Sequence, residues 1–118
     1  MIVKAALLQT DWAGTKVAML DKHEQAVHDA KAQGAQVMCF QVLFYGPYFC
    51  QVQDTQFYDY TERIPDGPTT RLMQELARKL KLETAPWQVD QNAGLIQFER
   101  KDGAIVTAPV QIIGAWNP

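Results

Sequence analysis

The 118-residue chain has a formal net charge of -2, with 47% hydrophobic and 20% charged residues. This composition is typical of one globular domain, and the small negative charge argues against a nucleic acid or an anionic membrane as partner. No run of residues is apolar enough to cross a membrane, and no secretory leader opens the chain. We therefore expect a single cytoplasmic domain over residues 1–118.

Two strands and a helix are predicted in the first forty residues. Ile2–Gln9 is apolar on both alternating faces, which is typical of a strand buried on two sides. Thr15 can cap a helix that runs to about Gln33, and Gly34 can end it. The core-facing stripe of this helix is expected to contain Leu20, His23, Val27 and Ala30. The apolar run over residues 35–41 predicts a second strand, parallel to the first.

The rest of the chain predicts a loop, a helix and a hairpin. Residues 43–65 are rich in aromatic side chains and lack sustained periodicity, which predicts a long packed loop with one helical turn near residues 54–58. Pro68 is suited to the first position of a helix that ends near Lys81. Its apolar stripe contains Leu72, Met73, Leu76 and Leu80. Residues 94–99 and 104–113 then predict two strands, joined at Asp102-Gly103. The fold class is therefore α/β.

Candidate metal, cofactor and disulfide sites are weak in this sequence. His23 and His28 are five residues apart, about 140° around a helix, so they cannot bind one metal ion from the same face. We expect His23 to be half-buried and His28 to be exposed. Cys39 and Cys50 are expected to be free thiols with structural roles. No glycine-rich phosphate loop occurs, so a nucleotide site has no support. Neither a metal nor another cofactor is expected.

One segment, Cys39–Gln51 (CFQVLFYGPYFCQ), resembles the nitrilase superfamily, in particular the N-carbamoyl-β-alanine and related N-carbamoyl amidohydrolases. Further matching motifs are Leu8-Gln9-Thr10, Lys22-His23-Glu24, Gly34-Ala35-Gln36 and Ile64-Pro65-Asp66-Gly67-Pro68. The resemblance covers about residues 1–82. It implies a partial nitrilase-like βαβα unit, here followed by a C-terminal β-hairpin. It also implies that the aromatic loop lines a substrate pocket, with Phe44, Tyr45, Tyr48 and Phe49 as candidate binding residues.

Enzymes of this superfamily attack an amide or carbamoyl carbon with a cysteine thiolate, using a glutamate as general base and a lysine to hold the oxyanion. The resemblance places Val42 at the general-base position, and valine cannot accept a proton. The lysine position falls near Gln111, and the nucleophile would lie beyond Pro118. No catalytic residue is therefore assigned. Val42→Glu is expected to create no activity and to destabilise the chain by about a few kcal/mol through burial of a carboxylate.

Residues 83–118 leave two alternatives open. They are either a drifted strand and hairpin of the same superfamily or part of a second fragment. The second alternative rests on the run Ala108–Gly114, which resembles an uncharacterised bacterial domain family. The second alternative makes the chain a chimera, engineered or otherwise recombined, and it is favoured here.

The leading functional hypothesis is a catalytically incomplete module that folds and self-associates. The alternatives are a carbon-nitrogen hydrolase that uses the aromatic loop in a new way, and a non-catalytic binder of carbamoyl or amide ligands. Self-association is expected because two helices on one face of the sheet leave the other apolar face uncovered. A two-fold homo-oligomer would then complete the sheet, unless the C-terminal hairpin covers that face in a monomer.

Overall fold

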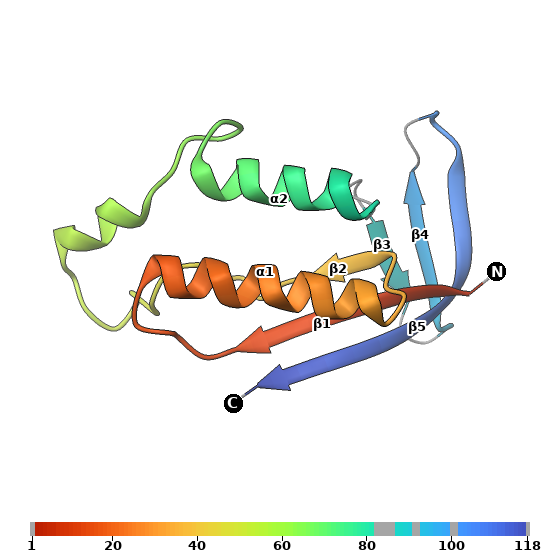
Figure 1. Cartoon of the computed structure of the whole chain (residues 1–118), viewed down its shortest axis with the longest axis horizontal. Coiled ribbons are helices and arrows are strands. Elements are labelled where there is room, and N and C mark those ends of the chain that lie inside the picture. Colours follow the sequence, from red (N-terminus) through yellow and green to blue (C-terminus); the bar gives the residue numbers. More distant parts are fainter. Residues whose placement is uncertain (1, 82–86, 91–92, 100–101, 118) are drawn as a thin grey trace.

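A computed structural model of the chain describes residues 2–81, 87–90, 93–99 and 102–117. The elements are β1 (Val3–Thr10), α1 (Lys16–Ala32), β2 (Val37–Cys39), the 3-10 helix η1 (Thr55–Tyr60), α2 (Pro68–Leu80), β3 (Trp87–Asp90), β4 (Leu95–Glu99) and β5 (Ile105–Asn117). Figure 1 shows the predicted α/β order, a βαβα unit followed by β-strands. Within the described ranges, neither helix is long and apolar enough to span a membrane.

The described strands form one sheet in the order β2-β1-β5-β4-β3. The strand β1 pairs in parallel with β2, where Ala5 is opposite Val37, and with the second half of β5, from Val3↔Val110 onward. The first half of β5 is antiparallel to β4, which is antiparallel to β3. In Figure 1, β4 and the first part of β5 lie at a steep angle to β1. The C-terminal hairpin therefore joins the sheet through β5, and β1 becomes an inner strand.

Helix α1 begins and ends where the sequence predicts. The Thr15 side chain accepts a hydrogen bond from the amide of Ala18 at 3.1 Å. After the helix, Gly34 adopts a left-handed conformation (φ +86°) that side-chain-bearing residues rarely adopt. The buried stripe consists of Met19, His23, Val27 and Ala30. Leu20 was expected there and is only partly buried, because it lies about 100° around the helix from Met19.

Two strands differ in length from the prediction by several residues, and one strand was not predicted. The strand β2 covers only Val37–Cys39 instead of residues 35–41. Beyond Cys39, a side chain replaces the backbone pairing with β1, since Oε1 of Gln41 accepts a hydrogen bond from the amide of Thr10 at 2.8 Å. The strand β5 continues to Asn117 instead of Ile113, since its parallel pairing with β1 continues to Thr10. The short strand β3 (Trp87–Asp90) was not predicted.

The sheet has a core on each face. On the α1 side, Ala6 packs with Ala30 and Ala35. Alternation along β1 directs Val3 and Ala5 to the opposite face, where they are buried in one cluster with three other residues. These three are Val37, Ile96 and Ala108.

The sheet face opposite α1 was expected to be uncovered. This expectation is wrong for the part of that face at the start of β1. The hairpin residues Ile96 and Ala108 pack there within the same chain. Further along β1 on that face, Leu7 is 40% exposed. A two-fold oligomer stays a prediction.

Candidate functional site

The aromatic loop between β2 and α2 encloses an open cavity of about 740 Å³. Its lining residues are Val42, Leu43, Phe44, Tyr45, Gly46, Pro47, Phe49, Val52, Gln53, Asp54, Thr55, Phe57, Tyr58, Tyr60 and Thr61. Three of the four candidate binding residues, Phe44, Tyr45 and Phe49, are among them. The fourth, Tyr48, is 59% exposed and lies outside the lining. Whether these residues bind a ligand stays a prediction.

The start of the loop is fixed to the end of β1 by Gln41. Its Oε1 accepts from the amide of Thr10, and its Nε2 donates to the carbonyl of Leu43 at 3.0 Å. Val42 lies between these two anchors and is 99% exposed at the rim of the cavity. The expectation that a carboxylate at position 42 would be buried is therefore wrong, because the chain leaves the sheet before that residue.

The loop packs on α1 through a cluster of rings. The ring centroid of His23 lies 4.0 Å from that of Phe44 and 5.3 Å from that of Phe40, and the two phenylalanine rings are 4.9 Å apart. His23 is completely buried instead of half-buried, and its Nδ1 lies 2.7 Å from the carbonyl oxygen of Met19. Burial lowers the pKa of His23, the hydrogen bond to Met19 opposes this shift, and the charge of Lys22 adds to it. His28 is partly exposed, with Nε2 3.9 Å from a carboxylate oxygen of Glu24.

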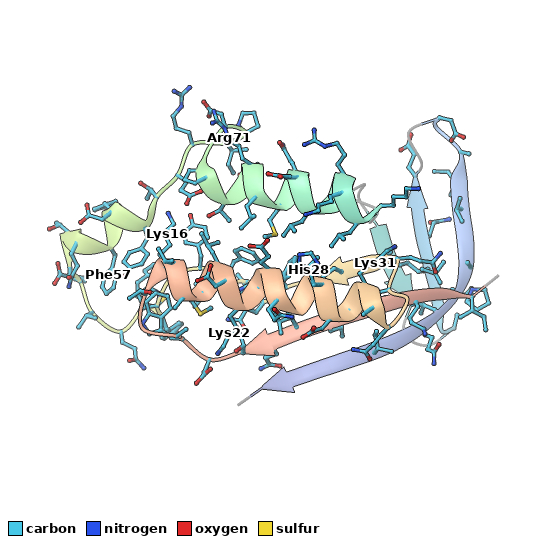
Figure 2. The ribbon with its side chains drawn as sticks, viewed as in Figure 1. Lys16, Lys22, His28, Lys31, Phe57 and Arg71 are labelled. Atoms are coloured by element: carbon cyan, nitrogen blue, oxygen red, sulfur yellow. The ribbon has the colours of Figure 1, made fainter. Side chains whose placement is uncertain are left out.

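An ion pair between Lys16 and Glu62 connects the end of the loop to both helices. The Glu62 side chain is only 7% exposed, and its carboxylate also accepts hydrogen bonds from the Thr69 amide and hydroxyl, both at 2.8 Å. Burial alone would raise the pKa of Glu62, but the bonds from Lys16 and Thr69 lower it on balance. The Lys16 ammonium also lies 4.5 Å from the centroid of the Tyr45 ring. Figure 2 shows Lys16 at the loop end of α1, with Phe57 in η1.

Sequence reasoning missed both Lys16 and Glu62. The one available signal was the position of Glu62 shortly before the predicted helix that begins at Pro68. A negative charge there interacts favourably with the free backbone amides of the first turn. Nothing in the local sequence links that residue to the start of α1. The pairing follows from the arrangement of α1 and α2, which contact each other.

Some of the polar groups near the cavity already have a partner. Asp54 caps η1, and its two carboxylate oxygens accept from the amide and the side chain of Gln56 at 2.9 and 2.7 Å. Both cysteines are free: Cys50 is exposed outside the cavity lining, and the Cys39 thiol donates to the carbonyl of Phe40 at 3.6 Å. Gln111, at the expected lysine position, pairs with Lys4 across β1 and β5. No group of three potential metal ligands occurs within the described ranges.

Comparisons with known proteins agree with this arrangement. The sequence model of the carbon-nitrogen hydrolase family matches residues 4–85, which is more than half of the chain. The chain belongs to the carbon-nitrogen hydrolase family. A second sequence model, that of a family of unknown function (DUF6882), matches residues 69–118. The resemblance of the C-terminal part to an uncharacterised family is thus confirmed, and the two matches overlap over residues 69–85, which include all of α2 except Pro68.

Curated relatives in the carbon-nitrogen hydrolase family are N-carbamoylputrescine amidases. The tomato (Solanum lycopersicum) protein is 38% identical over 82 residues, which are 67% of this chain and 26% of the relative. The Arabidopsis thaliana protein is 40% identical over 57 residues, 48% of this chain and 19% of the relative. The chain thus spans about a quarter of the length of these relatives or less. The resemblance to N-carbamoyl amidohydrolases is confirmed.

A solved structure supports the fold. The carbon-nitrogen hydrolase from Helicobacter pylori G27 superimposes with a TM-score of 0.59 over 85% of this chain and 36% of that chain. At 19% sequence identity, this similarity concerns the fold alone.

Proposed function

We propose that residues 1–118 form a catalytically incomplete carbon-nitrogen hydrolase module that folds and self-associates without hydrolysing amide or carbamoyl bonds. The observation that carries the proposal is Val42 at the position that the family resemblance gives to the general base. An aliphatic side chain cannot take a proton from a thiol or a water molecule. Loss of a general base alone lowers a rate by about 10²- to 10⁴-fold.

Among the described residues, the carboxylates of Asp54 and Glu62 do not offer a ready substitute for the base. The Asp54 carboxylate lines the cavity, but both of its oxygens accept hydrogen bonds from Gln56. The Glu62 carboxylate is held by Lys16 and Thr69, and the same ion pair occupies the Lys16 ammonium. Each of these groups therefore already has a structural partner, and a proton taken up by either carboxylate would weaken that interaction.

An ammonia-release assay tests the loss of activity. Purified protein is incubated with N-carbamoylputrescine and with N-carbamoyl-β-alanine, and ammonia is measured against a protein-free blank. We expect no release above the blank, for the chain itself and for Val42→Glu. Release that saturates with substrate and disappears after thiol alkylation would contradict the proposal.

The cavity supports a second candidate function, the binding of a small carbamoyl or amide ligand without turnover. Its volume of about 740 Å³ lies within the usual range for small-molecule sites, and its wall is rich in aromatic rings. A thermal-shift titration with N-carbamoylputrescine tests this function, with Phe57→Ala as the variant that removes a lining ring and Tyr48→Ala as the matched control outside the lining. A saturable rise in Tm that only Phe57→Ala abolishes is expected from a binder. The absence of any shift at millimolar ligand would contradict it.

Self-association is supported by the edge and the surface of the sheet. Among the described strands, β2 has a neighbour on one side only, so one row of its backbone groups is open to pairing. Leu7 and Ile105 on the sheet, and Val17 on α1, add exposed apolar surface. Light scattering coupled to size-exclusion chromatography tests this part of the proposal. A species of twice the 13.3 kDa chain mass or larger is expected, and a folded species of 13.3 kDa at micromolar concentration would contradict it.

A further inference from the structure

The ring cluster beneath the aromatic loop contains one titratable group, His23. It is completely buried, and its ring lies against both Phe40 and Phe44. Phe44 also lines the cavity, and its ring centroid is 6.2 Å from that of Tyr45, a second lining residue. His23 therefore supports the segment that begins the cavity wall without entering the cavity itself.

The hydrogen bonding of His23 fixes where a further proton would go. Because Nδ1 lies 2.7 Å from the carbonyl oxygen of Met19, Nδ1 carries the hydrogen in the neutral ring. A second proton must then bind Nε2, which is buried and has no hydrogen-bond partner among the described residues. The resulting N–H would be unsatisfied and charged in an apolar environment, which is among the least favourable states for a buried group.

Charged groups on the surrounding elements do not relieve this state. Lys22, the preceding residue on α1, disfavours a positive charge on the ring. The segment packed against the ring contributes Phe40 and Phe44, which are uncharged. The other charged groups on α1 and on the elements beside it either have a partner or lie at the surface. Lys4 binds the Gln33 carbonyl, Asp11 binds Lys22, Asp29 accepts from Gln25, Glu24 lies near His28, and Lys16 and Glu62 bind each other. Asp21, Arg71, Glu75, Arg78 and Lys79 are exposed, and Lys31 is partly exposed.

We propose that His23 is a pH-sensitive latch for the aromatic loop: protonation at Nε2 releases Phe40 and Phe44 from α1 and opens the first part of the cavity wall. The proton comes from the solvent during brief openings of the cluster, in which the ring becomes hydrated. The open form binds this proton and the closed form excludes it, so acidification shifts the population towards the open form. For one proton, the ratio of open to closed molecules rises by up to tenfold for each pH unit below about 6.5.

Hydrogen–deuterium exchange at pH 7.0 and pH 5.5 tests the latch, after correction for the intrinsic exchange rate at each pH. In the unmodified chain, the opening constant of amides in residues 40–45 is expected to rise by at least fivefold at pH 5.5, while the amides of β1 change by less than twofold. His23→Leu should remove the rise, because leucine fills similar space and does not titrate. His28→Gln is the matched control: it removes the partly exposed histidine of the same helix and should keep the rise.

The latch is overturned if the unmodified chain shows no rise, or if His23→Leu keeps it. An NMR titration of the unmodified chain gives an independent result that needs no variant to fold. The His23 ring signals are expected to titrate below pH 6.5 together with the ring signals of Phe44. Titration of His23 at or above pH 6.5, or Phe44 signals that stay constant through the His23 transition, would also overturn it.

Discussion

Removing the Glu62 carboxylate should destabilise the whole chain, because this one group connects the loop, α1 and α2. In Glu62→Ala, the amide of Thr69 loses its acceptor at 2.8 Å, and Thr69 is itself buried. An unsatisfied buried donor costs about 1–3 kcal/mol, and loss of the negative charge at the helix N-terminus adds about 0.3–1 kcal/mol. Lys16 is 26% exposed and can regain water, so losing its partner adds little.

The expected decrease in the free energy of unfolding is therefore about 1–4 kcal/mol. Urea denaturation followed by circular dichroism measures it. Glu75→Ala is the matched control, since it removes an exposed carboxylate from the same helix and should change stability by less than about 0.5 kcal/mol. A loss below about 1 kcal/mol in Glu62→Ala, or an equal loss in both variants, would show that the Glu62 carboxylate does not stabilise the start of α2.

Three further predictions concern single residues and pH. Val42→Glu should change the free energy of unfolding by less than about 0.5 kcal/mol in urea denaturation, because the Val42 side chain is 99% exposed. A loss of about 2 kcal/mol or more would show that position 42 is buried. Lys81→Gly should stabilise the chain by about 0.5–1 kcal/mol, because Lys81 ends α2 in a left-handed conformation (φ 53°); an unchanged or lower Tm would contradict this. Folding lowers the pKa values of both His23 and Glu62, so the free energy of unfolding should be highest above pH 6.5. It should fall first as His23 is protonated in the unfolded chain. It should fall again below about pH 4.5, as Glu62 loses its charge. Denaturation at each pH measures this, and His23→Leu should lack the first decline.

Local sequence signals predicted the elements well and their long-range pairing poorly. Thr15 and Gly34 carry their own conformational preferences, so the limits of α1 could be predicted without knowledge of its neighbours. The parallel pairing of β5 with β1 joins the two ends of the chain, and no local pattern specifies such a register. For this reason, the covering of Val3 and Ala5 by the hairpin was only the second alternative to an uncovered face.

The candidate site was predictable in composition but not in geometry. The density of aromatic residues predicted a packed loop, and the family resemblance implied that this loop lines a pocket. The exposure of Val42 was not predictable, because it depends on the side chain of Gln41 replacing a backbone partner of Thr10. Likewise, the burial of His23 depends on Phe40 and Phe44 returning to α1 from another part of the chain. Contacts of this kind arise from tertiary packing and leave little trace in local periodicity.

The proposed lack of hydrolase activity is tested with the highest sensitivity under near-stoichiometric conditions. Protein and N-carbamoylputrescine labelled with ¹³C in the carbamoyl carbon are mixed at similar concentrations, and NMR follows the label for a day. We expect the carbamoyl signal to persist and labelled bicarbonate to stay at the level of the protein-free blank. Labelled bicarbonate that increases with protein concentration and is abolished by alkylation of the cysteines would contradict this expectation.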